Sequence, residues 1–252
     1  MIKLPRTLHI EGSGLSSTKD PEVIQFSKLA DEFLYVEEKL DGTGVSIFFD
    51  DQLKIQVWHR GSPATGKEFY RLNAWTIQHQ DELFDLLEDR YSLFGEWMLY
   101  KHTVFYDRLS TYFFESDMYD RKEEVWLSTF ARESMLRRHD YIRSVPVLAA
   151  FRPTRLSQIT DLVKRSLYQS EHWREVLWKK SEKENFNLKE ILEQCDQSDL
   201  AEGLYIKHED EKQVLGRYKF VRPAFVERII NSGSHVMDRE PFYNISVEGN
   251  LV

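Results

Sequence analysis

The chain is poor in cysteine and has no long hydrophobic run. Its one cysteine, Cys195, excludes a disulfide framework and a zinc site built on cysteine ligands. No stretch reaches the roughly 18 apolar residues that a membrane-spanning helix requires, and the first residues lack the apolar segment of a signal peptide. We therefore expect a cytoplasmic protein without a membrane segment.

The sequence also lacks an excess of basic residues. It has 34 Lys and Arg against 42 Asp and Glu, which gives a net charge of −8. This balance excludes a uniformly basic protein that coats nucleic acid, but a local basic cleft is still compatible with it. Hydrophobic residues make up 41% of the 252 residues and can form a sizeable core. Because there is no repeat or linker, we expect a single domain over residues 1–252.

The hydrophobic pattern alternates between strand-like and helical stretches. Around Asp50-Asp51, apolar and polar residues alternate on both sides, which is typical of a hairpin. Strand-rich flanks around a helical insertion predict an α+β fold. The expected strand regions are 31–60, 91–100, 111–130 and 202–222, and the expected helical regions are 67–90 and, as the insertion, about 131–198.

A candidate nucleophile stands just before the first alternating strand, in the segment Glu38-Lys39-Leu40-Asp41-Gly42. A lysine followed two positions later by an acidic residue, then by glycine, is a pattern for an amine that attacks phosphorus. An amine with an ordinary pKa near 10.4 is protonated at neutral pH, so we expect nearby cations and partial burial to lower the pKa of Lys39. Alone, so short a segment is also compatible with a solvated charged turn.

Four further segments follow in order: Phe94-Gly95-Glu96-Trp97, Tyr112-Phe113-Phe114, Glu202 to Lys207, and Arg217-Tyr218-Lys219. Together with the Lys39 segment they resemble motifs I, III, IIIa, IV and V of the covalent nucleotidyltransferases. That superfamily contains ATP-dependent DNA ligases, RNA ligases and mRNA-capping guanylyltransferases. The resemblance spans about residues 36–222. It implies the nucleotidyltransferase fold of antiparallel sheets flanked by helices, with the helical insertion between motifs IIIa and IV.

Within the superfamily the chain is most similar to the T4 RNA ligase 2-like group. DNA ligases and capping enzymes continue after motif V into an OB-fold domain, and the residues after Arg222 are too few for such a barrel, so none is expected. Two positions depart from the group. Gly44 stands where the phage enzymes have asparagine, and Ser116-Asp117 stands where motif IIIa usually ends in Phe-Asp.

The resemblance implies how the nucleotide is bound. Lys39 becomes lysyl-AMP, Glu38 lies beside the adenine, and Phe113 stacks on the adenine face, with Tyr112 and Phe114 as competitors for that role.

The resemblance also implies metal and phosphate ligands. Asp41, Glu96 and Glu202 are expected to hold Mg²⁺ or Mn²⁺ through water, and Glu96 also to bind the ribose. The nucleotide-binding cations are expected to be Arg60, Lys207, Arg217 and Lys219. On a regular strand Glu202 and Lys207 project to opposite faces, so both reach one pocket only if the strand bends. Arg217 and Lys219 share a face, which suits a polyphosphate.

Two other patterns have competing interpretations. The run from Gly61 to Lys67 matches most of a P-loop, but Glu68 replaces the required Ser or Thr, so we expect a loop that leads into a helix. The helical insertion carries a set of basic residues that either contact RNA phosphates or form ordinary ion pairs. They are Arg132, Arg137, Arg138, Arg143, Arg152, Arg155, Lys164 and Arg165.

The expected activity is therefore that of an ATP-dependent RNA ligase, which joins RNA 3′-OH and 5′-phosphate ends through lysyl-AMP with ATP and Mg²⁺ or Mn²⁺. RNA binding would come from the basic insertion or from a partner subunit. The alternatives are a minimal ATP-dependent DNA ligase, a capping-type guanylyltransferase, and a nucleotide- or RNA-binding module without catalysis.

Overall fold

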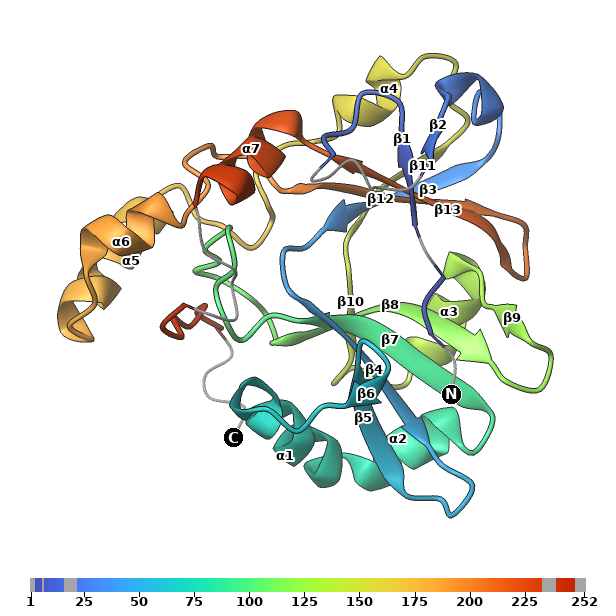
Figure 1. Cartoon of the computed structure of the whole chain (residues 1–252). Helices are drawn as coiled ribbons and strands as arrows, with labels where there is room; N and C mark the ends of the chain where they lie inside the picture. The colour runs from blue at the N-terminus through green and yellow to red at the C-terminus, as the bar shows by residue number, and fades with distance from the viewer. Residues whose placement is uncertain (1–2, 6, 16–21, 233–238, 248–252) are drawn as a thin grey trace.

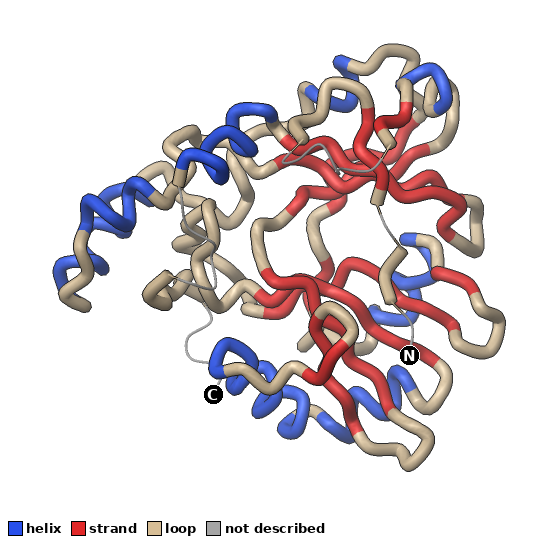
Figure 2. Tube along the Cα trace, in the orientation of Figure 1, coloured by secondary structure: helices blue, strands red, loops and turns tan. Residues whose placement is uncertain are grey.

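The computed structural model describes residues 3–5, 7–15, 22–232 and 239–247. Two β-sheets lie one above the other, with helices on their outer faces (Figure 1, Figure 2). The six-stranded sheet has the order β11 (Val147–Phe151), β3 (Leu34–Lys39), β12 (Gly203–Glu209), β13 (Val214–Val221), β1 (Leu8–Ile10), β2 (Val23–Ile24). The seven-stranded sheet has the order β10 (Arg143–Ser144), β8 (Phe113–Asp120), β7 (Tyr91–Trp97), β4 (Thr43–Phe49), β5 (Ile55–His59), β6 (Ser62–Pro63), and β9 (Val125–Trp126) pairs with β8.

Most neighbouring strands are antiparallel. The exceptions are β1, which is parallel to β13 and β2, and β10, which is parallel to β8. The chain passes from the six-stranded to the seven-stranded sheet between β3 and β4, so residues 40–42 connect the two layers.

The alternation along β3 and β12 determines which side chains enter the core of the six-stranded sheet. Leu34 and Val36 on β3, with Leu204 and Ile206 on β12, are fully buried and pack with Ile159 of α4 (Ser157–Thr160). The alternate residues of β3, Tyr35, Glu37 and Lys39, point to the opposite face, towards the other sheet. The pattern that builds the core therefore also points Lys39 inward, between the two sheets.

The seven-stranded sheet packs its other face against α1 (Tyr70–Gln78) and α2 (Gln80–Leu87). Val45 and Ile47 of β4 belong to this core, together with Leu72 of α1 and Leu83 of α2. The opposite face of β4 carries small or half-buried side chains, because it does not pack against these helices.

The remaining helices surround the two sheets. They are η1 (Phe26–Lys28), η2 (Lys67–Phe69), α3 (Thr129–Leu136), α5 (Trp173–Lys183), α6 (Leu188–Glu193) and α7 (Pro223–Asn231). Ser128 caps α3 and Asn187 caps α6 through side-chain oxygens that accept backbone N–H groups. Trp173 and Ile191 form a third core with Phe242.

The expected α+β fold of antiparallel sheets and helices is confirmed. The expected helical insertion is only partly helical, because it also supplies β11 to one sheet and β10 to the other. Pro146 lies between these strands, and a proline cannot continue a helix. Strand β10 pairs with β8 and strand β11 pairs with β3, which lie earlier in the chain. Local periodicity does not reveal such pairing between separate segments.

Residues 67–87 form η2, α1 and α2, close to the helical region expected at 67–90. The run from Gly61 to Lys67 forms a turn, the short strand β6 and the entry to these helices, as expected for a false P-loop match. In the part of the chain that the structure covers, no helix has the length and apolar character needed to cross a bilayer.

Candidate active site

Lys39 ends β3 at the point where the chain leaves one sheet for the other. Its Nζ lies 2.7 Å from Oε1 of Glu202, and Lys39 pairs with Gly203 in the neighbouring strand. Glu202 comes just before β12 begins, so strand alternation does not apply to it and its carboxylate reaches the lysine. A Cβ on Gly203 would lie 1.9 Å from the carbonyl oxygen of Phe220, so only glycine fits at this strand start.

The two carboxylates nearest to Lys39 have unusual proton affinities. Burial raises the pKa of Glu96 to about 7 and that of Glu202 to about 7, even though Lys39 opposes the shift in both cases. Burial alone would lower the pKa of the Lys39 ammonium, but Glu202 and Glu96 outweigh it and hold that pKa above its usual value. The expectation of a lowered pKa for Lys39 is therefore wrong.

Asp41 anchors the connection that follows Lys39. Its Oδ2 accepts backbone N–H groups of Thr103 (2.6 Å) and Val104 (2.8 Å), and its own N–H donates to the Tyr106 hydroxyl at 2.8 Å. The other oxygen, Oδ1, lies 3.8 Å from Nδ1 of His102. These bonds tie residues 101–106 to the end of β3, so the geometry favours a positioning role for Asp41 over a metal ligand.

The register places the expected cations at different distances from Lys39. Facing residues form rows across β3, β12 and β13, and adjacent rows on one face are about 7 Å apart. Lys219 lies in the row next to that of Lys39, and its charge lowers the pKa of Glu202. Lys207 and Arg217 lie one row further away. The structure thus brings Lys219 towards Glu202, but not Lys207 or Arg217 towards Lys39.

Lys207 and Arg217 belong instead to a buried ion network between the sheets. Lys207 Nζ lies 2.9 Å from Glu37 Oε2 and 3.4 Å from Asp117 Oδ1, and Arg217 lies 2.9 Å from the same Asp117 oxygen. We therefore assign these two cations to the buried network and not to the nucleotide phosphates.

Arg132 completes the network from α3. It bonds Glu37 at 2.9 Å and also bonds Glu115, which connects β3 with β8. Its side chain is 1% exposed. Arg132 is therefore not a surface residue that could contact RNA, and of the two interpretations of the basic residues it fits the one that has them in ion pairs. Arg137 and Arg138, on the same segment, are exposed.

A β-bulge decides which aromatic residue faces the Lys39 side. Phe94 of β7 pairs with Asp117 of β8, but the next residue, Gly95, pairs with Glu115, so Ser116 is the extra residue. Phe114 consequently pairs with Glu96 and shares its face of the sheet. The unusual Ser116-Asp117 pair thus lies at the bulge itself.

Phe113 points into the opposite core. It packs 5.6 Å from the Trp75 ring of α1, ring centre to ring centre, and is 2% exposed. The Phe113 assignment for adenine stacking is therefore contradicted by its direction, and Phe114 replaces it as the candidate. Tyr112, the other competitor, packs on Trp97 and donates its hydroxyl to the Asn244 carbonyl.

Glu38 lies on the other face of β3 from Lys39, beneath residues 166–168. Its Oε2 accepts the Leu167 N–H at 3.3 Å, while Oε1 is buried without a hydrogen-bond partner in the part of the chain that is described. Burial raises its pKa. Tyr168 of the same segment covers Phe114, with ring centres 4.6 Å apart. An unsatisfied acceptor and a covered aromatic ring are thus close in the fold.

Arg60 occupies a tight turn at the edge of the site. Arg60 and Gly61 both have positive φ (47° and 88°), as in the two-residue hairpin turn that joins β5 and β6. Arg60 and Gly44 line a pocket with Glu96. The expected position of Arg60 near the ribose and phosphates of the nucleotide is therefore compatible with the structure.

Several site residues were not anticipated from the sequence. Tyr168, Arg132 and Glu37 act through partners that are distant along the chain, and no local pattern marks such partners. A signal was available for Glu37 alone, because a second acidic residue two positions before Lys39 must share the inward face of β3.

Comparison with known proteins agrees with this architecture. The structure resembles Naegleria gruberi RNA ligase with PPi, with a TM-score of 0.54 and 18% identity over 90% of this chain and 63% of that chain. Two variants of that ligase with ATP and Mn give TM-scores of 0.54, at 16% and 15% identity, and cover 82% and 89% of this chain and 54% and 59% of theirs. At such identities the likeness shows the fold, and the chain spans less than two-thirds of these ligases.

No curated protein sequence gives a significant match. The family described as RNA ligase matches residues 32–221, which is well over half of the 252 residues and includes every motif from Lys39 to Lys219. The chain belongs to the RNA ligase family.

Proposed function

We propose that this protein is an ATP-dependent RNA ligase that works through a lysyl-AMP intermediate. The observation that carries the proposal is the position of Lys39, which lies between two sheets against Glu202 and under the influence of Glu96. Two carboxylates with pKa values near neutrality beside one lysine, Glu202 buried and Glu96 half-buried, are typical of a functional site. The Naegleria ligase structures with ATP and Mn or with PPi support the same chemistry.

A divalent metal fits the donor set. Glu96 and Glu202 are oxygen donors whose pKa values are raised chiefly by burial, with repulsion from Glu202 and Asp41 adding to the shift at Glu96, and a bound cation would favour their ionised forms. Among the residues of known placement, no group of three or more acidic, histidine or cysteine side chains is arranged to hold a metal directly. We therefore propose that Glu96 and Glu202 hold Mg²⁺ or Mn²⁺ through water, where it would offset the charge of the ATP phosphates.

The residues of the site can carry out the adenylyl transfer in a balanced way. Lys39 Nζ forms a bond to the α-phosphorus while the bond to the pyrophosphate oxygen breaks. One ammonium proton passes to Glu202, which is in contact and has a pKa of about 7, and the second proton, released as the P–N bond forms, passes to the departing pyrophosphate or to water. Lys219, in the adjacent row, supplies positive charge on the phosphate side.

The adenine site requires one local movement. Glu38 Oε1, which is buried and has no hydrogen-bond partner among the described residues, can accept a hydrogen bond from the adenine amino group. Phe114 can stack on the base after Tyr168 moves off its ring, because the two rings are in contact now. We therefore propose that the segment 166–168 shifts when ATP binds.

In the later steps, AMP passes from Lys39 to an RNA 5′-phosphate, and a 3′-OH then displaces it as the strands join. Arg60, in the exposed turn that borders Glu96, is placed to contact the RNA or the nucleotide phosphates.

The decisive measurement is the intact mass of the protein after incubation with ATP and Mg²⁺. We expect the wild-type chain to gain one AMP and Lys39→Ala to gain none. Lys189→Ala, at a lysine whose side chain is 86% exposed, is the matched control and should gain AMP normally. A folded wild-type protein that gains no AMP with either Mg²⁺ or Mn²⁺ would contradict the proposal. Nicked RNA and nicked DNA substrates then distinguish an RNA ligase from a minimal DNA ligase.

A further inference from the structure

A groove leaves the candidate active site along the face of the seven-stranded sheet that is turned away from α1 and α2. Its floor consists of three successive rows of facing residues on β5, β4 and β7. The first row contains Gly44 and Glu96, the second Trp58, Ser46 and Phe94, and the third Gln56, Phe48 and Ser92. Two pockets, one beside Glu96 and one over the third row, share the wall residues Trp58 and Phe94 and therefore adjoin along the groove. At about 7 Å per row, it extends roughly 14 Å.

The small residues Gly44 and Ser46 keep the centre of this groove low. A Cβ on Gly44 would meet only Glu96 Oε1, at 3.7 Å, so the space above it is open. Trp58 and Phe94 stand on either side of Ser46. A strand row with aromatic residues flanking a small one forms a slot with flat walls.

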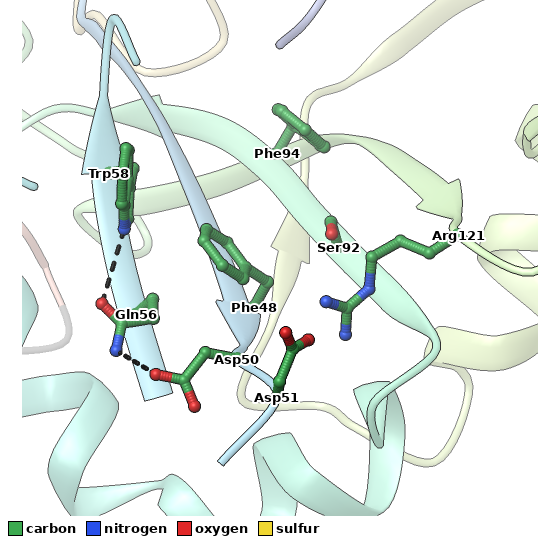
Figure 3. Close-up of a pocket in the computed structure, with 8 residues that line it drawn as sticks. All are labelled: Phe48, Asp50, Asp51, Gln56, Trp58, Ser92, Phe94 and Arg121. Atoms are coloured by element: carbon green, nitrogen blue, oxygen red, sulfur yellow. Dashed lines mark hydrogen bonds between the residues drawn. The ribbon is translucent and has the colours of Figure 1, made fainter. Parts of the chain in front are cut away.

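The far pocket, of about 330 Å³, combines aromatic surface with hydrogen-bonding groups. Figure 3 shows Phe48 and Trp58 on neighbouring strands, with Arg121 entering from the other side and facing the Asp51 carboxylate. The Nη1 group of Arg121 donates a hydrogen bond to the Phe49 carbonyl at 2.9 Å. Its Nη2 is buried and has no hydrogen-bond partner among the residues that the structure describes.

Charge distinguishes the two ends of the groove. The end beside Glu96 is lined by the basic residues Lys3 and Arg60. The far pocket has one cation, Arg121, against the carboxylates of Asp50 and Asp51. Phosphates are repelled from a pocket with two carboxylates, but a nucleobase is neutral, stacks on aromatic rings and has both donors and acceptors at its edges.

We propose that this groove binds an unpaired RNA strand whose end is in the active site, with its backbone near Arg60 and one base in the pocket between Trp58 and Arg121. This inference rests on the proposed ligase function. The base stacks on Trp58 and lies against the half-buried Arg121 guanidinium that lines the pocket, and its donors face Asp51. The slot lies between the side chains of Trp58 and Phe94, so its shape suits one unpaired RNA strand. Its near end opens beside Glu96.

The test separates RNA binding from adenylyl transfer. We would measure the binding of a fluorescein-labelled, 5′-phosphorylated single-stranded RNA by anisotropy for wild type, Trp58→Ala and Arg121→Gln, at one fixed salt concentration. Loss of one stacking ring is expected to weaken binding by about tenfold or more. Trp178→Ala is the matched control, because Trp178 is 43% exposed on α5 and is not in the groove.

In the same samples, the gain of one AMP reports the function of Lys39. The inference predicts normal AMP gain and weakened RNA binding for Trp58→Ala and Arg121→Gln, and unchanged binding for Trp178→Ala. Trp58→Phe keeps a stacking face and should recover most of the affinity, which excludes simple misfolding as the cause. Unchanged RNA affinity in the folded double variant Trp58→Ala/Arg121→Gln would overturn the proposal that RNA binds in this groove. Absence of AMP gain in wild type would instead contradict the ligase function.

Discussion

At the scale of single residues, the function of each side chain depends on the strand face that it occupies. Phe113 and Phe114 are adjacent and chemically identical, yet one enters the core with Trp75 and the other shares a face with Glu96. Their substitutions should therefore have different effects.

Phe114→Ala is expected to weaken ATP binding, because the proposed base loses its stacking partner, by about fivefold to a hundredfold. Phe113→Ala removes a ring that packs on Trp75 and should lower the free energy of unfolding by about 3–5 kcal/mol without changing ATP affinity. Phe114 is also buried, so its loss should lower stability as well, and ATP affinity is the readout that separates the two variants. Equilibrium denaturation and the ATP dependence of AMP gain measure the two effects. If Phe113→Ala weakened ATP binding at unchanged stability, the assignment would be reversed.

The proton affinity of Glu96 predicts a pH-dependent stability. Its pKa is about 7 in the folded protein and ordinary, near 4.5, in the unfolded chain. A raised pKa contributes stability that is full below the unfolded pKa and is lost as the pH rises through about 7. Glu96→Gln cannot ionise, so it should gain roughly 1–3 kcal/mol over wild type between pH 5 and pH 8. Thermal unfolding at both pH values tests this, and a difference that does not depend on pH would contradict it.

At the scale of secondary-structure elements, the sequence predicts what is local and misses what depends on distant pairing. The hairpin around Asp50-Asp51, the helices at 67–87 and the strands of motifs III to V follow from periodicity, because core burial imposes it on each segment. Strands β10 and β11 are too short to show a period, and they exist because β8 and β3 pair with them.

The candidate site shows the same division. The sequence predicted Lys39, Glu96 and Glu202 as site residues, since motif order marks them, and the structure brings them together. It preferred Phe113 and left Phe114 as a competitor, because a bulge that shifts the phase of β8 by one residue at Ser116 cannot be seen in the sequence. It also could not separate Lys219 from Lys207, whose surroundings come from residues far away along the chain.

The bulge itself gives a prediction for β7 and β8. A Cβ on Gly95 would lie 2.2 Å from the Phe114 carbonyl oxygen and 2.7 Å from the Phe113 ring. Gly95→Ala should therefore separate the strands, lower the unfolding free energy by at least about 2 kcal/mol and reduce AMP gain as Glu96 moves. Gly44→Ala is the matched control for stability, since its Cβ has an ordinary contact at 3.7 Å. Equal unfolding energies for the two variants would show that β8 tolerates the added methyl group.

At the scale of the whole molecule, the two sheets are joined through charges as well as through the chain. Glu37, Lys207 and Arg217 come from one sheet, Glu115 and Asp117 from the other, and Arg132 from α3. Removing one member leaves its partners buried and unpaired, which costs more than the net strength of any one pair.

Arg132→Met is therefore expected to lower the free energy of unfolding by about 3–5 kcal/mol. Arg137→Met, at an exposed position of the same segment, should change it by less than about 0.5 kcal/mol. Urea denaturation of both variants is the measurement. If Arg132→Met were as stable as wild type, the network would not hold the sheets together.

The six charges of this network, three acidic and three basic, cancel as a set. A single substitution that changes one of them leaves a net charge in a dry interior, whereas a compensating pair of substitutions does not. As sequences of this family diverge, positions 37, 115, 117, 132, 207 and 217 should therefore change together, in combinations that conserve their summed charge. The interior of this protein thus constrains its evolution as a balance among six sites rather than as six separate requirements.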